Sequence, residues 1–219
     1  MSRRALLAEF VGTAFLLIGV VGSGIMAERL SEDVGLQLLV NAAATAAVLY
    51  AIIIAFAPVS GAHFNPAVTL ADAALGERHW RTVPAYLAAQ VSGGAVGVII
   101  ANLMFDLDAV TWSTRERSGA DQWLGEVVAT YGLVLLVFAV IRSGRGHLVA
   151  GGVAVYIGGA YWFTSSTSFA NPAVSVTRTM SDTFAGIEPS SAPMFILMQL
   201  IGAGLAVLTV RELFPSDPR

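Results

Sequence analysis

Six apolar stretches, each about 20 residues long, constrain the fold of this chain more than any other feature of its sequence. A helix of that length crosses roughly 30 Å of hydrocarbon. We expect membrane spans at 5–27, 35–57, 83–105, 123–142, 147–165 and 192–213. Only 12% of the residues are charged, against roughly a quarter in soluble domains. The sequence therefore predicts an all-α membrane protein and disfavours a soluble protein with an unusually apolar core.

The basic residues, all of them arginine, predict the orientation of the spans. One set of span ends carries Arg3, Arg4, Arg78, Arg81, Arg142, Arg145, Arg211 and Arg219. The loops at the other ends are acidic and contain Glu32, Asp33, Asp106, Asp108, Glu116, Asp121, Asp182 and Glu188. Because basic loops stay in the cytoplasm, both termini are expected there. The net charge of −3 gives no indication of nucleic-acid binding.

The two halves of the chain repeat the same phrases. "AEFVGTAFLL", which contains Glu9, matches "GEVVATYGLVLL", which contains Glu126, and "AAQVSGGAVGV" matches "LMQLIGAGLAV". We expect one channel-like domain over residues 1–219. It contains two repeats, about 1–115 and 118–219, with three spans in each. An odd number of spans inverts the second copy relative to the first. Inverted repeats with broken helices place a substrate site near the bilayer midplane.

Each repeat also contains a short apolar piece, 65–76 or 171–182, that starts with Asn-Pro-Ala and is too short to span. Asparagine caps helix N-termini and proline favours the first helical position, so each triplet predicts a helix start. Two such helices entering from opposite faces would bring their positive dipole ends together. A pore centred there repels cations and passes neutral solutes. The candidate constriction comprises Asn65, Pro66, Ala67, Asn171, Pro172 and Ala173.

With these motifs, "SGAHFNPAVTL" and "SFANPAV" included, the sequence resembles the aquaporin family, also called the major intrinsic proteins, over essentially the whole chain. The resemblance implies six tilted transmembrane helices plus two half-helices, assembled as a homotetramer in the lipid bilayer with one pore per subunit. It implies that Asn65 and Asn171 line the constriction and that Glu9 and Glu126 support the two half-helix loops. His63 is expected on the cytoplasmic side, either lining the pore or in a structural role. The sequence has no nucleotide-binding loop, no paired catalytic carboxylates and no histidine cluster with metal spacing, so no cofactor, metal or enzymatic activity is expected.

The sequence departs from orthodox water channels at the outer filter. The position directly after the second triplet, usually arginine, is Val174, and gap-free counting adds Thr45, Gly159 and Ser168 to the filter. These small uncharged residues predict a wide neutral filter. A bacterial branch associated with arsenic-resistance operons resembles this pattern, which implies a multi-pass inner-membrane protein. It also implies a passive channel for trivalent arsenic, including methylated forms, and other small uncharged polyol-like solutes.

Several alternatives remain open at this level. The channel could be a water or glycerol facilitator without an arsenic role. Inverted repeats also occur in coupled secondary transporters, although the only acids well inside spans are the two repeat-related glutamates. Arg178, one turn beyond Val174, could face the pore vestibule or pair elsewhere, with Asp182 as a helical partner. The aromatic run 161–163 predicts an interfacial belt, with one ring as a candidate to fill the empty filter.

Overall fold

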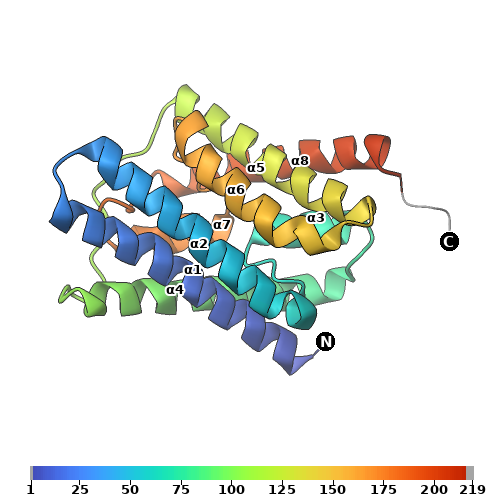
Figure 1. Cartoon of the computed structure of the whole chain (residues 1–219), viewed down its shortest axis with the longest axis horizontal. Coiled ribbons are helices and arrows are strands. Elements are labelled where there is room, and N and C mark those ends of the chain that lie inside the picture. Colours follow the sequence, from blue (N-terminus) through green and yellow to red (C-terminus); the bar gives the residue numbers. More distant parts are fainter. Residues whose placement is uncertain (1, 216–219) are drawn as a thin grey trace.

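A computed structural model describes residues 2–215, so Arg219 lies outside the described residues. The regular secondary structure of these residues is helical, in the order α1 (Arg3–Leu30), α2 (Val34–Ser60), α3 (Pro66–Ala74), η1 (Trp80–Thr82), α4 (Val83–Met104), α5 (Ala120–Arg142), η2 (Gly146–Leu148), α6 (Val149–Phe163), α7 (Pro172–Thr177), η3 (Arg178–Met180) and α8 (Ala192–Leu213). The long helices run roughly along the longest axis of the molecule (Figure 1). The start of α1 and the end of α8, next to the two termini in sequence, lie at the same end of the molecule, as six crossings require.

Within residues 2–215, five helices are long and apolar enough to span a membrane: α1, α2, α4 with its preceding η1 turn, α5 and α8. The sixth predicted span, 147–165, is shorter than expected. Its α-helical part, α6, covers only 15 residues, about 22 Å. The 3₁₀ turn η2 precedes it directly, and together the two segments reach about 28 Å. The chain therefore still crosses six times, but the last stretch before the second short helix is at the lower limit of length.

Glycines allow the two helices of a pair to approach until their backbones are in contact. A Cβ on Gly93 or Gly97 of α4 would lie 2.2 Å or 2.3 Å from a backbone oxygen of α1. On α8, a Cβ on Gly202 would lie 2.4 Å from the carbonyl oxygen of Val127 in α5. Small residues allow this approach in membrane helices, where dispersion contacts replace the hydrophobic effect. The α1–α4 and α5–α8 pairs thus use the same device in the two halves of the chain.

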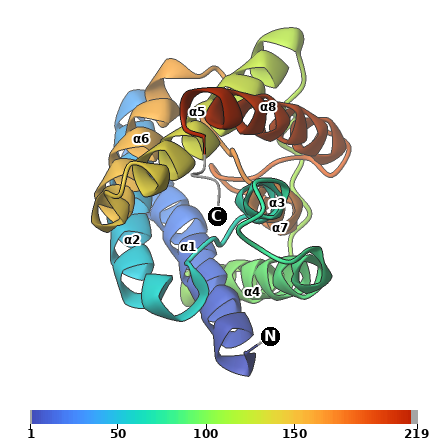
Figure 2. The same cartoon turned by 90° about the vertical axis from the view of Figure 1, so that its right-hand side faces the viewer.

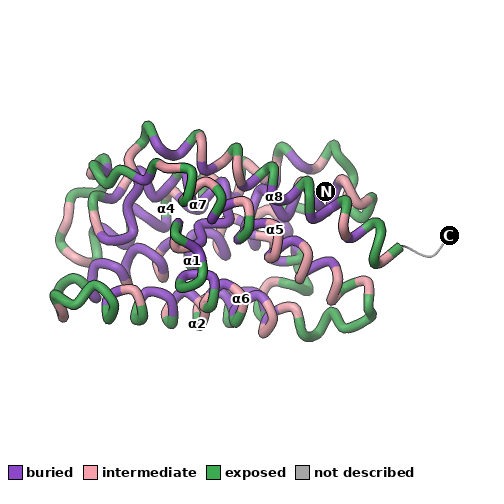
Figure 3. Tube along the Cα trace, turned by 90° about the horizontal axis from the view of Figure 1, so that it is seen from above, coloured by how far each residue is buried: buried purple, intermediate pink, exposed green. Residues whose placement is uncertain are grey.

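The short helices α3 and α7 lie between α4 and α8, on the side of the bundle away from α2 and α6 (Figure 2). Viewed along the long axis, α3 lies in front of α7 (Figure 2), and in the side view α3 lies nearer the end that carries the termini. Buried residues follow the inner side of the chain trace, and exposed residues lie on the outer turns (Figure 3). Large apolar side chains are exposed on these outer turns, among them Leu7, Val155 and Leu208. Such a surface suits lipid rather than water.

Candidate functional site

A cavity of about 280 Å³ lies between the helices and passes the N-termini of both short helices. Its apolar wall comes from α1, α2, α5 and α6, with residues such as Leu16, Ile53 and Val137. Its other side is formed by residues of the loops before α3 and α7 and by side chains of the short helices themselves. Such a passage suits small polar solutes. The polar groups of the loop side can replace hydrogen bonds that a solute makes to water, while the apolar side offers none.

The two loops before α3 and α7 have the same unusual backbone. Ala62 and Phe64 have φ values of 52° and 50°, and Ser168 and Ala170, at the equivalent distances from the next asparagine, have 52° and 48°. Non-glycine residues in this left-handed region cost about 1–3 kcal/mol each. The surrounding structure must hold both loops in this shape.

A buried carboxylate holds the first loop. The two oxygens of Glu9 accept hydrogen bonds from the backbone N–H groups of His63 at 3.0 Å and Phe64 at 2.8 Å. Ser60 and Gln90 donate to the same carboxylate at 2.6 Å and 2.7 Å. Glu9 is fully buried, and a buried acceptor with four donors compensates for the loss of its hydration.

The second loop is held by an equivalent carboxylate. Glu126, also fully buried, accepts from the N–H groups of Phe169 and Ala170, both at 2.9 Å. Gln199 donates to Glu126 at 2.5 Å and to Ser175 Oγ at 2.8 Å, as Gln90 donates to Glu9 and to Thr69. Each of the two repeat-related glutamates is therefore bound to the loop before a short helix, and each cluster contains one glutamine.

The two Asn-Pro-Ala asparagines meet in the middle of the fold. Each side-chain oxygen caps its own helix, from Ala67 N–H at 2.9 Å and from Ala173 N–H at 3.0 Å. Each amide nitrogen also crosses to the other loop: Asn65 Nδ2 donates to the carbonyl of Ala170 at 2.7 Å, and Asn171 Nδ2 to that of Phe64 at 2.8 Å. One amide hydrogen of each asparagine thus ties the halves together, which leaves the other for a solute in the cavity.

Only three of the four residues that counting assigned to the filter line the cavity. Thr45, Ser168 and Val174 line the cavity, and Ser168 Oγ has no hydrogen-bond partner within residues 2–215. Gly159 is exposed on the outer face of α6 and does not line the cavity, so its placement in the filter was wrong. The α6 residue at this level is Tyr161, 3% exposed, whose hydroxyl lies 3.1 Å from Thr45 Oγ1.

Helical periodicity explains the error at Gly159. The cavity-lining residues of α6 are Val153, Ile157 and Tyr161, spaced four apart. Residues four apart share a helix face, and Gly159 falls between them on the opposite face. The aromatic run divides in the same way: Tyr161 points inward, whereas Trp162 and Phe163 are 52% and 57% exposed, as a membrane-interface belt requires. A periodicity count along α6, instead of a count back from Asn171, would have found Tyr161.

Arg178 lies in the wall of the cavity and is only 2% exposed. Its guanidinium stacks over the ring of Phe169, with the central carbon 3.5 Å from the ring centroid, and its Nε donates to the carbonyl of Ala185. The alternative partner fails, because Asp182 accepts from Thr114 instead, at 2.9 Å. The filter region is therefore neither as empty nor as uncharged as the sequence predicted.

A second arginine supports Phe169 from the loop between α4 and α5. Arg117 lies 5.1 Å from the Phe169 ring centroid, and its Nε donates to the carbonyl of Gly186 at 2.8 Å. Burial, followed by the positive charge of Arg178, lowers the pKa of Arg117 to about 9. Arg117 therefore still carries its charge at neutral pH, behind the wall that Arg178 lines.

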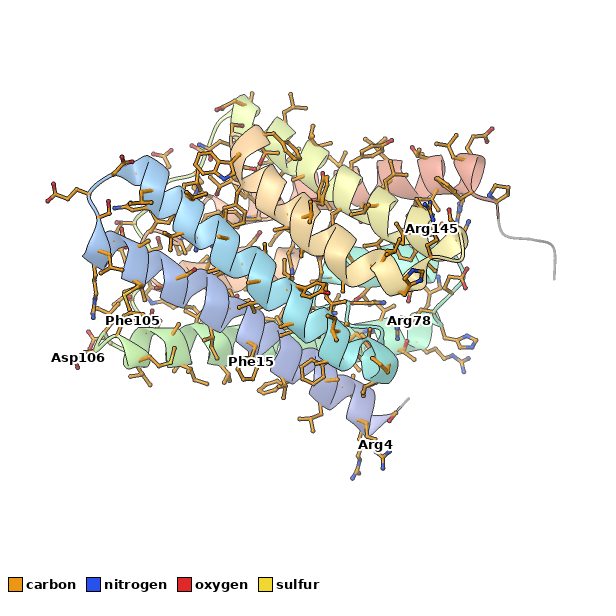
Figure 4. All side chains as sticks on the ribbon, in the orientation of Figure 1. Arg4, Phe15, Arg78, Phe105, Asp106 and Arg145 are labelled. Atoms are coloured by element: carbon orange, nitrogen blue, oxygen red, sulfur yellow. The ribbon has the colours of Figure 1, made fainter. Side chains whose placement is uncertain are left out.

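The other end of the cavity carries an ionic cluster. Asp72 accepts from Arg78 Nε at 2.8 Å, and His63 Nε2 lies 3.4 Å from the same oxygen. Arg78 stacks over the ring of Tyr86, 4.0 Å from its centroid. His63, Asp72 and Arg78 all line the cavity, so His63 is a pore-lining residue as well as part of this cluster. Figure 4 shows Arg78 near the end that carries the termini.

Comparisons with known proteins agree with this architecture. The family profile described as major intrinsic protein matches residues 1–169. The chain is 46% identical over 216 residues to "Aquaglyceroporin AqpS" of Rhizobium meliloti (strain 1021), covering 98% of this chain and 92% of that protein. It is 31% identical to "Aquaporin NIP1-4" of Oryza sativa subsp. japonica, covering 90% and 72%.

A solved structure shares the fold. The aquaglyceroporin from Plasmodium falciparum superposes with a TM-score of 0.79 at 18% identity, covering 97% of this chain and 96% of the other. With the paired asparagine-capped helices, the two carboxylate clusters and the cavity between the helices, these findings place the protein among passive membrane channels rather than enzymes. The chain belongs to the major intrinsic protein family.

Proposed function

We propose that this channel conducts uncharged hydrogen-bonding solutes larger than water, above all arsenous acid, together with methylated trivalent arsenicals, glycerol and water. One observation carries the proposal: Val174, directly after the second Asn-Pro-Ala, lines the cavity where water channels carry a guanidinium. The isopropyl group of valine occupies less of the pore's cross-section than a guanidinium does, and it forms no hydrogen bond to a solute. The name of the Rhizobium relative, an aquaglyceroporin, supports passage of glycerol.

The polar groups around Val174 suit a polyol-like solute. The Thr45–Tyr161 hydroxyl pair lies on the α2–α6 side, and the unpaired hydroxyl of Ser168 lies on the loop side. Arsenous acid is neutral at physiological pH and presents three hydroxyl groups, as glycerol does. It can exchange hydrogen bonds between these groups and the free amide hydrogens of Asn65 and Asn171. A neutral solute also loses little by passing a buried positive charge.

Substituting Val174 by arginine is expected to narrow the pore. In proteoliposomes, we expect Val174→Arg to lower arsenite and glycerol uptake at least about tenfold and to change water permeability by less than about threefold, because only larger solutes need the full bore. Val174→Met, which adds bulk without charge, is the matched control and should show an intermediate loss. A wild-type channel that passes water rapidly but excludes both solutes would contradict the proposal.

We further propose an assembly and orientation for the channel. The two halves form inverted repeats, four subunits assemble as a homotetramer, and the protein lies in a bacterial inner membrane with both termini in the cytoplasm. The distribution of charge supports the orientation. Arg4, Arg78 and Arg145 lie at the end that carries the termini, and Asp106 lies at the opposite end (Figure 4).

The lack of cysteine makes the orientation simple to test. Ser118→Cys lies in the exposed loop before α5, and Ser143→Cys in the exposed loop after it. In intact spheroplasts, a membrane-impermeant maleimide is expected to label Ser118→Cys. Ser143→Cys should be labelled only after the membrane is permeabilised. The reverse pattern would overturn the proposed orientation.

A further inference from the structure

The two short helices carry charged residues at equivalent positions. The third residue after each asparagine is valine, Val68 in one helix and Val174 in the other. The seventh is charged in both: Asp72 follows Asn65, and Arg178 follows Asn171. Asp72 and Arg178 both line the cavity, and both lie beyond the valine. The passage therefore has a charged side chain toward each of its two ends.

Only one of the two charged side chains forms an ion pair within residues 2–215. The carboxylate of Asp72 is paired with Arg78 at 2.8 Å and lies 3.4 Å from His63. Arg178 forms no ion pair with any residue in the range 2–215, and its one hydrogen bond goes from Nε to a backbone carbonyl. Its terminal nitrogens have no protein partner in that range. Beside it lies a second buried arginine, Arg117, which also lacks an ion pair there.

We propose that Arg178 is the specificity-determining residue of the outer half of the pore, excluding cations and donating hydrogen bonds to solute oxygens from one helical turn beyond Val174. The proposal rests on the channel function proposed above and names the charge that this function requires. A guanidinium buried to 98% acts through a low local dielectric, where its repulsion of a cation is far stronger than in water. Stacking on Phe169 fixes its position.

This placement reconciles a wide bore with cation exclusion. Four residues along the helix place the α-carbon of Arg178 about 6 Å beyond that of Val174. The level of Val174 itself then carries no guanidinium on the residue that follows Asn-Pro-Ala. The terminal nitrogens of Arg178 offer donors to a hydroxyl-rich solute before it reaches that level. A guanidinium directly after Asn-Pro-Ala would also repel cations and donate hydrogen bonds to the solute, but it would narrow the pore at the level of Val174.

The test compares Arg178→Gln with the wild type in proteoliposomes. We expect the variant to dissipate an imposed proton or potassium gradient at least about tenfold faster, because the repulsive charge is gone. Glycerol and arsenite uptake should also fall, by more than about threefold, because a glutamine amide offers the solute fewer donors than a guanidinium does. Arg115→Gln is the matched control, since Arg115 is exposed in the neighbouring loop, stacks on Phe184 and does not line the cavity. The double variant Val174→Arg with Arg178→Gln should regain cation exclusion and lose arsenite uptake.

A cation-tight Arg178→Gln channel with normal solute uptake would overturn the proposal. If that variant does not assemble, the wild type still decides the question: in a tenfold KCl gradient, the reversal potential of its residual conductance should favour chloride. A cation-favouring reversal potential would overturn the role of Arg178. Wild-type uptake of water alone would instead contradict the proposed solutes, and leave the cation measurements to judge Arg178 separately.

Discussion

Glu126→Ala is expected to abolish solute uptake and to destabilise the folded channel by about 3–5 kcal/mol. The substitution leaves three donors, the N–H groups of Phe169 and Ala170 and the amide of Gln199, without their acceptor inside the protein. Each buried donor left unpaired costs about 1–3 kcal/mol. The loop also loses the support that holds Ser168 and Ala170 at positive φ. Heating in detergent followed by gel filtration, and arsenite uptake in proteoliposomes, measure the two effects.

The controls for this prediction separate loop support from a general loss of charge. Glu126→Gln keeps the shape of the side chain and one oxygen acceptor, so an intermediate loss is expected. Glu32→Ala removes an exposed carboxylate between α1 and α2 and should behave as the wild type. Glu9→Ala should reproduce the Glu126→Ala phenotype, since its contacts are equivalent. Normal stability and uptake in Glu126→Ala would show that the loop holds its shape without the carboxylate.

Gly202→Ala is expected to separate α8 from α5 and to lower the yield of assembled channel severely. The added methyl group would lie 2.4 Å from the carbonyl oxygen of Val127 and 3.1 Å from the amide nitrogen of Tyr131. Both are backbone atoms, so no side-chain rotation relieves the clash. Overpacking costs about 1–3 kcal/mol where the structure can adjust. Here the adjustment would move α8, which carries Gln199 of the Glu126 cluster.

The neighbouring glycine provides a matched control. A Cβ on Gly204, two residues further along α8, would meet no described atom within 4 Å. Gly204→Ala should therefore leave stability unchanged, or raise it by up to about 1 kcal/mol through helix propensity. Thermal unfolding and gel filtration of the two variants give the comparison. Equal losses for both would show that the close approach of α5 and α8 does not limit the fold.

The sequence alone determined the architecture, because its signals are local or repeated. Spans follow from the length of apolar runs, and helix starts follow from asparagine and proline at Asn65 and Asn171. The structure places both caps as predicted. The matching phrases paired Glu9 with Glu126, and the resemblance implied their role; in the structure each accepts hydrogen bonds from the loop before a short helix.

The tertiary structure alone decided the filter, because a pore wall depends on which face of each helix turns inward. Counting residues back from Asn171 placed Gly159 in the pore, although the path through the intervening loop, 164–171, is not a helix and does not preserve helical phase. The structure turns Tyr161 inward and Gly159 outward. It also decided that Arg178 stacks on Phe169 and lines the cavity instead of pairing with Asp182. A charged residue one turn beyond a motif can line a cavity or form an ion pair, and the packing around it decides between the two.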